Sequence, residues 1–314
     1  MPEGHTTHAL AGRLNRAFAG SPVAVSSPQG RFDDGAALLD GLTLTEASAW
    51  GKHLFVEFEG ERWLNVHLGL IGRFSVRRHH LGLQPDARPA GMPESQVPPR
   101  TQVLLGSQIP VEGQVRLRLL NDAWVGDLRG PTVCAVLTPD KVDQIRARLG
   151  PDPLRPDADP GLALHRISGS ARPIGELLMD QGVLAGVGNV YRCEVLFRHR
   201  VDPFRPGREI RPVTWQAIWD DLVTLMPLGV AFGQILTMDD QVADAMQALA
   251  EVTDGSAAAH TEAGTGARLG DRFERRFYLY KRTGEPCRVC GARVRTRLVA
   301  GRNLFWCGRC QRRR

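Results

Sequence analysis

The stretch from Cys287 to Cys310 reads CRVCGARVRTRLVAGRNLFWCGRC and contains two Cys-x-x-Cys pairs separated by sixteen residues. Four thiolates are the number that a tetrahedral structural zinc ion takes. The residues between the pairs predict two short strands around Ala300-Gly-Arg-Asn303, and a glycine at such a turn is typical of a β-hairpin. We therefore predict one structural zinc ion that holds a β-hairpin, with four ligands: Cys287, Cys290, Cys307 and Cys310.

Two disulfide bonds in a secreted domain are the alternative interpretation of these cysteines. No signal-peptide pattern opens the sequence, and only four of its six cysteines fall into the framework. We therefore favour zinc in a cytosolic protein. Cys134 and Cys193 stand alone in apolar surroundings, which is typical of buried structural thiols rather than reactive ones.

The charge of the chain favours a polyanionic partner. Its formal net charge is +6, and the segment from Lys281 to Arg314 holds eleven Lys or Arg residues against one Glu. A solvated basic tail is the alternative, but metal-fixed geometry and the interleaved Phe305 and Trp306 favour a nucleic-acid surface. No apolar run approaches the roughly 20 residues of a membrane span, so we expect no membrane association.

Lysine is scarce in this chain. Only three of the 40 basic residues are lysines, namely Lys52, Lys141 and Lys281. Arginine cannot lose its proton near neutral pH, whereas a lysine amine can serve as an acid, a base or a nucleophile. In a chain that uses arginine for nearly all of its positive charge, each retained lysine is therefore a candidate for a specific chemical task.

The N-terminal segment, residues 1–138, predicts a β-sandwich with one flanking helix. Apolar residues recur every four positions in a helix from Thr6 to Ala19. The period then changes to two, which is typical of strands. The predicted strands cover residues 52–58, 63–68, 115–119 and 132–137. Residues 80–110 are rich in Pro, Gly and Gln and predict a long loop inserted between strands.

The remainder predicts a helical domain at 139–270 and the zinc hairpin at 271–314, so the fold class is multidomain α+β. A stiff Pro-rich linker covers residues 150–160. The predicted helices cover residues 140–149, 162–167, 173–181, 189–198 and 214–232. Residues 239–270 are rich in Ala, Gly and Asp, and we expect a mobile loop there.

The first four residues, Met1-Pro2-Glu3-Gly4, predict a nucleophile. Removal of Met1 would leave Pro2 with a secondary amine, and an α-amino group has a pKa of about 7.7–8.0. Such an amine attacks an aldehyde-like carbon to form an iminium, an electron sink that permits β-elimination. Glu3 beside it is a candidate proton donor. A frayed terminus is the alternative interpretation.

A second candidate lies in Ala185-Gly-Val-Gly-Asn-Val-Tyr191. The glycine-rich turn delivers Asn189 to the start of a helix, where free backbone N–H groups favour a phosphate. A purely structural turn is the alternative.

Together these motifs resemble the formamidopyrimidine-DNA glycosylase/endonuclease VIII family over the whole chain, most closely an actinobacterial endonuclease VIII. That family has a β-sandwich, a helix-two-turn-helix domain and a zinc finger, with DNA between them. The resemblance rests on Met1-Pro2-Glu3-Gly4, Gly51-Lys52-His53-Leu54, His67-Leu68-Gly69, Pro173-Ile174 with Met179-Asp180-Gln181, Gly186-Val187-Gly188-Asn189-Val190-Tyr191, and the cysteine quartet with Gly301-Arg302.

The resemblance implies a role for each matching residue. Pro2 would attack C1′ of the deoxyribose, and Glu3 would protonate the opening sugar ring. Lys52 would grip phosphate and assist proton transfer, while Asn189 and Arg302 would clamp the phosphates that flank the flipped nucleotide. The enzyme would excise a damaged base and cut the strand by β,δ-elimination. It would act as a monomer on DNA in the cytoplasm, at the nucleoid, without a nucleotide or flavin cofactor.

Departures from the family pattern bear on the substrate. His5-Thr6 stands where the family commonly has Pro-Glu, so the role of a further N-terminal carboxylate is open. Asp127-Leu-Arg-Gly-Pro-Thr132 stands where guanine-directed members have Asp-Pro-Arg-Arg-Phe-Gly, so Arg129 remains and the Phe wedge is absent. Leu70 is the other expected intercalating residue. We therefore favour oxidised pyrimidines (thymine glycol, 5-hydroxycytosine, 5-hydroxyuracil).

Two alternatives remain open at this point. The first is that the chain is a non-catalytic zinc-ribbon DNA-binding relic of the family. The second is that it is mainly an abasic-site lyase. The basic charge and the ribbon suit all three interpretations. The joint presence of the catalytic set favours the glycosylase, namely Pro2, Glu3, Lys52, Asn189 and Arg302.

Overall fold

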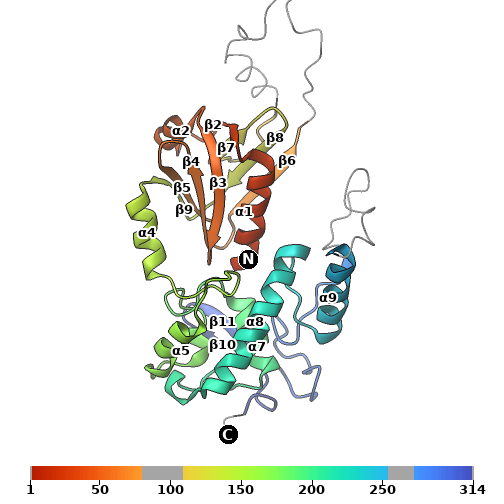
Figure 1. Ribbon diagram of the computed structural model, residues 1–314. Helices are drawn as coiled ribbons and strands as arrows, with labels where there is room; N and C mark the ends of the chain where they lie inside the picture. The colour runs from red at the N-terminus through yellow and green to blue at the C-terminus, as the bar shows by residue number, and fades with distance from the viewer. Residues whose placement is uncertain (1, 80–108, 254–271, 313–314) are drawn as a thin grey trace, which may run out of the picture. The chain divides into compact units, whose positions relative to one another are not determined.

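The computed structural model describes residues 2–79, 109–253 and 272–312 (Figure 1). The chain divides into two compact units. The first contains Met1–Pro2 and Leu10–Ala147, and the second contains Glu3–Ala9 and Arg148–Arg314. Helix α1 (Gly4–Phe18) therefore contributes its first turns to the second unit and the rest to the first. The boundary falls after Ala147 rather than after residue 138, and the zinc hairpin belongs to the second unit.

The first unit is an antiparallel β-sandwich, as predicted. One sheet has the order β1-β3-β4-β5-β9 and the other β2-β7-β8-β6. The five-stranded sheet contains β1 (Ser21–Pro22), β3 (Thr43–Trp50), β4 (His53–Phe58), β5 (Arg62–His67) and β9 (Val133–Leu137). The four-stranded sheet contains β2 (Ala24–Ser26), β6 (Arg73–Arg78), β7 (Leu117–Leu120) and β8 (Trp124–Arg129). Two further helices are α2 (Asp33–Leu39) and α4 (Pro139–Arg148).

The core of this unit lies between the sheets and α1. Leu10, Leu14 and Phe18, the residues that predict the helix, are fully buried together with inward-facing strand residues such as Leu54 and Leu64. The helix starts at Gly4, two residues before its predicted start at Thr6. Its apolar stripe explains the architecture, because one face of α1 and the alternating strand residues share one core.

The second unit is mainly helical as far as Thr253 (Figure 1). Its helices are α5 (Pro160–Ser168), α6 (Ile174–Leu177), α7 (Asn189–Arg198), the short η3 (Gly207–Glu209), α8 (Pro212–Phe232) and α9 (Asp239–Thr253). Helix α7 has the predicted bounds. Helix α6 covers only four of the nine residues predicted for it. A core that includes Trp215 and Leu222 of α8 joins these helices.

The prediction of a mobile loop at 239–270 is wrong for its first half. Residues Asp239–Thr253 form α9, and Val242, Ala245 and Ala248 join the core of the helical unit. Their spacing of three residues places these small apolar side chains on one helix face. Residues 254–270 of the predicted loop and residues 80–108 of the predicted insertion lie outside the described residues.

The C-terminal hairpin is formed by β10 (Arg295–Val299) and β11 (Arg302–Trp306). Its turn has two residues, Ala300 and Gly301, with φ angles of 47° and 71°. Positive φ at both central residues is typical of the type I′ turn that suits a two-residue hairpin. Arg302 is therefore the first residue of β11 and not part of the turn.

Candidate active site and metal centre

The four predicted zinc ligands come together in the second unit. The Sγ atoms of Cys287, Cys290, Cys307 and Cys310 all lie within 4.8 Å of one another. Two of the separations are 3.9 Å (Cys287 to Cys310) and 3.4 Å (Cys290 to Cys307), close to the edge of about 3.8 Å that tetrahedral Zn–S bonds of about 2.3 Å produce. All four cysteines are free of disulfides. The residues present fit one structural zinc ion.

Glu3 is fully buried and closes the start of α7. Its carboxylate accepts hydrogen bonds from the backbone N–H groups of Gly188 (2.9 Å), Val190 (2.8 Å) and Tyr191 (3.4 Å). These are N–H groups that a helix leaves without internal partners, at the positive end of its dipole. The expectation that they bind a phosphate is wrong, because Glu3 occupies them.

The glycines around α7 allow this contact. A side chain at Gly188 would overlap the Glu3 carboxyl group, and a Cβ at Gly4 would lie 2.7 Å from Cα of Gly186. Gly186 itself has a φ of 87°, which side chains rarely tolerate. The Gly4 N–H also donates to the Gly186 carbonyl (2.8 Å). The glycine-rich turn therefore serves to seat the N-terminal segment in the helical unit.

Two histidines hold the same segment. The buried His5 meets the ring of Tyr191 edge-on, with centroids 5.6 Å apart. Burial lowers the pKa of His5 to about 3, so its ring is neutral at physiological pH. His8 Nε2 contacts Oδ2 of the fully buried Asp152 at 2.8 Å. Residues 3–8 are therefore fixed to the helical unit at several points. The sequence alone assigned neither histidine this anchoring role.

Asn189 and Arg302, the two predicted phosphate ligands of the second unit, are linked through β11. Asn189 is only 4% exposed, and its Nδ2 donates to the carbonyl of Asn303, the residue after Arg302 (2.9 Å). Arg302 is half-buried and donates to the carbonyl of Gly301 (3.0 Å). The fold thus brings both side chains to neighbouring positions.

Lys52 lies in the first unit, in the tight turn between β3 and β4 rather than on a strand. Two histidines to which the sequence assigned no role lie near it. His53 and His67 face each other across β4 and β5 with ring centroids 5.0 Å apart. Burial lowers the pKa of His53 to about 4, and burial followed by the Lys52 charge lowers that of His67. The positive charge of Lys52 therefore stands beside neutral imidazoles.

The loop between β5 and β6 presents two aliphatic side chains to solvent. Leu70 is 50% exposed and Ile71, which sequence reasoning missed, is 87% exposed. A Cβ at Gly72 would overlap the Leu68 carbonyl, so the loop is tight. Adjacent exposed aliphatic residues on a tight loop favour insertion into an apolar partner such as a base stack.

Arg129 lies at the end of β8 and is held by its neighbours. Its guanidinium donates to the Glu112 carbonyl (2.9 Å), to Ser75 Oγ (3.2 Å) and to Asp127 Oδ2 (3.1 Å). Asp127 also forms a buried ion pair with Arg118 (2.7 Å). In this structure Arg129 joins the end of β8 to β6 and to the backbone at Glu112, and its contact with DNA stays a prediction.

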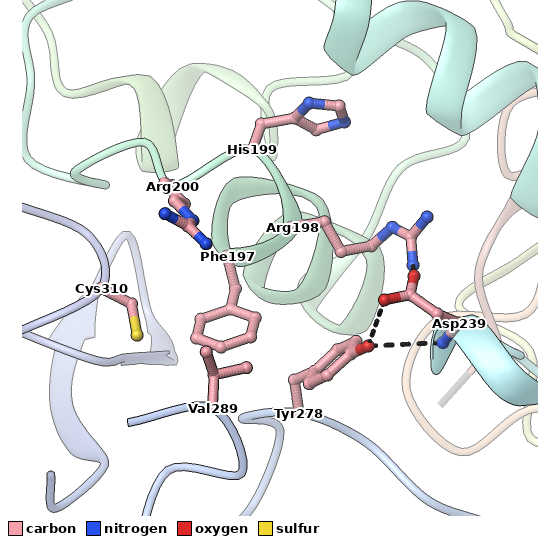
Figure 2. A pocket seen from close by; sticks show the side chains of 8 residues that line it. All are labelled: Phe197, Arg198, His199, Arg200, Asp239, Tyr278, Val289 and Cys310. Atoms are coloured by element: carbon pink, nitrogen blue, oxygen red, sulfur yellow. Dashed lines mark hydrogen bonds and ion pairs between the residues drawn. The ribbon is translucent and has the colours of Figure 1, made fainter. Parts of the chain in front are cut away.

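A pocket of about 210 Å³ opens in the second unit at the C-terminal end of α7 (Figure 2). Tyr278 donates from its hydroxyl to Asp239 Oδ2 at one side of it (2.7 Å). The ten residues of α7 separate this end from Asn189 by roughly 15 Å, at 1.5 Å per residue. Cys310 is the only predicted site residue that lines it, so we do not assign the candidate site to this pocket. The lining residues are Phe197, Arg198, His199, Arg200, Asp239, Tyr278, Val289 and Cys310.

None of the helices in the described part of the chain is long and apolar enough to cross a membrane.

Three family models match the chain in sequence. They are the formamidopyrimidine-DNA glycosylase N-terminal domain (residues 1–119), the formamidopyrimidine-DNA glycosylase H2TH domain (149–240) and the zinc finger found in FPG and IleRS (284–313). Their order matches the sandwich, the helical region and the cysteine hairpin described above. The matched models thus assign the chain to the class of DNA glycosylases that carry a helix-two-turn-helix domain.

Comparison with individual proteins narrows this class. Endonuclease 8 1 of Mycobacterium tuberculosis is 47% identical over 313 residues, covering 99% of this chain and all of that one. The formamidopyrimidine-DNA glycosylase of Thermus thermophilus is 31% identical, covering 88% and 85%. The chain belongs to the formamidopyrimidine-DNA glycosylase/endonuclease VIII family. A Lactococcus lactis formamidopyrimidine-DNA glycosylase in complex with DNA containing N7-benzyl-Fapy-dG shares the fold, with a TM-score of 0.71, 19% identity and coverage of 99% and 100%.

Proposed function

We propose that this protein is a bifunctional DNA glycosylase and abasic-site lyase. It excises oxidised bases, pyrimidines above all, through a Schiff base at Pro2 and then cuts the strand by β,δ-elimination. The observation that carries the proposal is the anchoring of Glu3 and Gly4 at the turn before α7. A frayed N-terminus would need no buried carboxylate and no glycine at position 188.

The chemistry begins at the N-terminal amine. With Met1 removed, the nitrogen of Pro2 bonds to C1′ while the bond from C1′ to the damaged base breaks, and the base leaves with the electron pair. The Glu3 carboxylate takes up the proton that the Pro2 nitrogen releases and passes it to the sugar-ring oxygen as the ring opens, which leaves an iminium between Pro2 and C1′. The departing base takes its proton from solvent. Loss of a C2′ proton then expels the 3′ phosphate, and a second elimination expels the 5′ phosphate.

The DNA is held by residues from both units. Lys52 binds backbone phosphate in the first unit, and Asn189 and Arg302 bind the phosphates beside the flipped nucleotide in the second. Leu70, joined by Ile71, fills the space that the nucleotide leaves. Arg129 stays a candidate contact to the opposite strand. Zinc supplies no chemistry in this proposal, because it holds the hairpin that carries Arg302.

The absence of a Phe wedge after β8 favours oxidised pyrimidines over oxidised guanine. We further propose that the protein works as a monomer, without a nucleotide or flavin cofactor, in the cytoplasm at the nucleoid, where its DNA substrate lies. A non-catalytic DNA-binding relic would keep the zinc hairpin and Asn189. It would have no need to retain Pro2, Glu3 and Lys52 together.

Borohydride trapping tests this proposal on duplexes that each carry one defined lesion. We expect a covalent adduct and strand cleavage with thymine glycol, 5-hydroxycytosine and 5-hydroxyuracil, less with 8-oxoguanine and none with undamaged DNA. Trapping at a preformed abasic site alone would assign the protein as mainly a lyase. Binding without any adduct would support the relic.

A further inference from the structure

Arg192 of α7 is a buried arginine one turn after Asn189. Its side chain is fully buried, and its guanidinium donates to the Gly175 carbonyl (2.9 Å) and to Asn189 Oδ1. Its Nε is buried without an acceptor, and no carboxylate in the described parts of the chain forms an ion pair with it.

Stability does not explain an arginine in this place. A buried charge costs several kcal/mol unless an opposite charge and hydrogen bonds compensate it. Two other arginines with little exposed side chain follow that rule, since Arg118 (5% exposed) pairs with Asp127 at 2.7 Å and Arg198 (17% exposed) with Asp221 at 2.7 Å. Arg192 is the exception among the three.

The electrostatic surroundings of Arg192 reach the candidate site. Burial is the main cause that lowers the pKa of its guanidinium, Cys193 and Glu3 raise it, and Arg302 lowers it. The nearby Glu3 already accepts three backbone hydrogen bonds. Arg192 and Arg302 therefore make the electrostatic potential around Asn189 more positive. Among the described residues, no carboxylate forms an ion pair with either guanidinium group.

The bond to Asn189 also determines which way that amide faces. Arginine has only donors, so the Asn189 atom that meets it must be the oxygen. The amide nitrogen is thereby directed to the Asn303 carbonyl, on the side of β11. Without Arg192 the amide keeps only the Asn303 carbonyl to orient it, and its oxygen loses the donor that holds it.

We propose that Arg192 is a positioning residue for DNA phosphate. It fixes the amide of Asn189 with its N–H donors toward β11, and it supplies a buried positive charge that a phosphate held by Asn189 and Arg302 balances. This inference rests on the proposed function, because it assumes that Asn189 and Arg302 bind backbone phosphate.

A double-mutant cycle tests it. Affinity for a duplex with a central tetrahydrofuran abasic-site analogue is measured by fluorescence anisotropy at several salt concentrations. The variants are Arg192→Met, Asn189→Ala and the double variant. We expect Arg192→Met to weaken binding by about ten- to a hundredfold, the equivalent of one charge-assisted hydrogen bond, and to reduce the salt dependence. In the Arg192→Met background, Asn189→Ala should weaken DNA binding by less than a further factor of about two, because the Asn189 amide is already misplaced there.

Arg198→Met is the matched control on the same helix. Arg198 bonds Asp221 and the Thr237 carbonyl at the far end of α7. Its loss should lower the Tm and leave affinity within about twofold, as expected for a residue remote from the bound phosphate.

Two outcomes overturn the proposal. One is wild-type DNA affinity in Arg192→Met. The other is a double variant whose loss of affinity equals the product of the losses in the two single variants. If Arg192→Met loses zinc or its cooperative unfolding, Arg192→Lys replaces it in the same cycle, and effects that multiply there also overturn the proposal. A wild-type protein that binds no DNA would instead refute the proposed function, so the two failures are distinguishable.

Discussion

At the residue scale, Glu3 joins the N-terminus to α7 through both of its carboxylate oxygens. We expect Glu3→Gln to bind duplex DNA, to lose base excision and to retain some cleavage at preformed abasic sites, where no base has to leave. The glutamine NH₂ would face backbone N–H groups, so stability should fall by about 1–3 kcal/mol. Excision and abasic-site cleavage are compared on matched duplexes, with urea unfolding alongside. Equal loss on both substrates would show that Glu3 is needed for every step or only for structure.

Gly188 offers a second test at this scale, because a methyl group there would overlap Glu3. Gly188→Ala should lower the Tm and depress excision, since either Glu3 or the start of α7 must move. Gly12→Ala is the matched control. Gly12 lies within α1, where an added Cβ comes no closer than 3.5 Å to Arg16 Nη1, so alanine should stabilise the helix by about 0.5–1 kcal/mol. Normal excision by Gly188→Ala would contradict the close seating of the N-terminal segment.

At the element scale, the phosphate contact of Arg302 can be removed in two ways, by replacing Arg302 itself or by removing the zinc ion that holds its hairpin. Arg302→Ala and Cys290→Ser should both weaken DNA binding and excision, but only Cys290→Ser should release zinc. The affinity lost with Arg302 should be about 1.5–3 kcal/mol and should shrink as salt rises. Arg302→Lys should recover part of it, because a point charge does not replace a two-pronged grip. Binding assays with zinc quantification check this, and normal function of Arg302→Ala would direct attention to Arg297 or Asn303.

The loop between β5 and β6 is the second element open to test. Leu70→Ala and Ile71→Ala should each leave folding stability within about 0.5 kcal/mol, because both side chains are largely exposed. Each should reduce excision from duplex DNA, and the double variant should reduce it most. Cleavage of a single-stranded abasic substrate serves as the control, since no stack has to be filled there. Unchanged duplex excision by the double variant would remove these residues from the proposed DNA contact.

Elements with a strong local pattern were predictable and others were not. The four-residue apolar spacing of α1, the β4–β5 hairpin and the cysteine spacing each specify their element locally. Strand β8 was missed because it carries Gly126 and the buried Asp127, which local patterns associate with turns. Helix α9 was missed because its alanine-rich, acidic sequence resembles a linker, and its identity depends on packing against the core.

At the scale of the whole molecule, residues near the N-terminus belong to the same compact unit as the C-terminal half of the chain. Glu3–Ala9 belong with Arg148–Arg314, whereas most of α1 belongs with the sandwich. No local pattern predicts this, because it depends on Glu3 meeting the N–H groups before α7. The same reason hid Arg192, Asp152 and His53 from sequence reasoning, since buried polar residues acquire their roles only from tertiary partners.

The most direct measurement concerns the N-terminal amine. Borohydride trapping on a thymine glycol duplex is compared for the wild-type protein, for Pro2→Gly and for a form with extra residues before Pro2. We expect Pro2→Gly to lose most of the adduct and the extended form to lose all of it, because its nitrogen becomes an amide without nucleophilic character. Undiminished trapping by the extended form, with the adduct mapped to Lys52, would contradict Pro2 as the nucleophile.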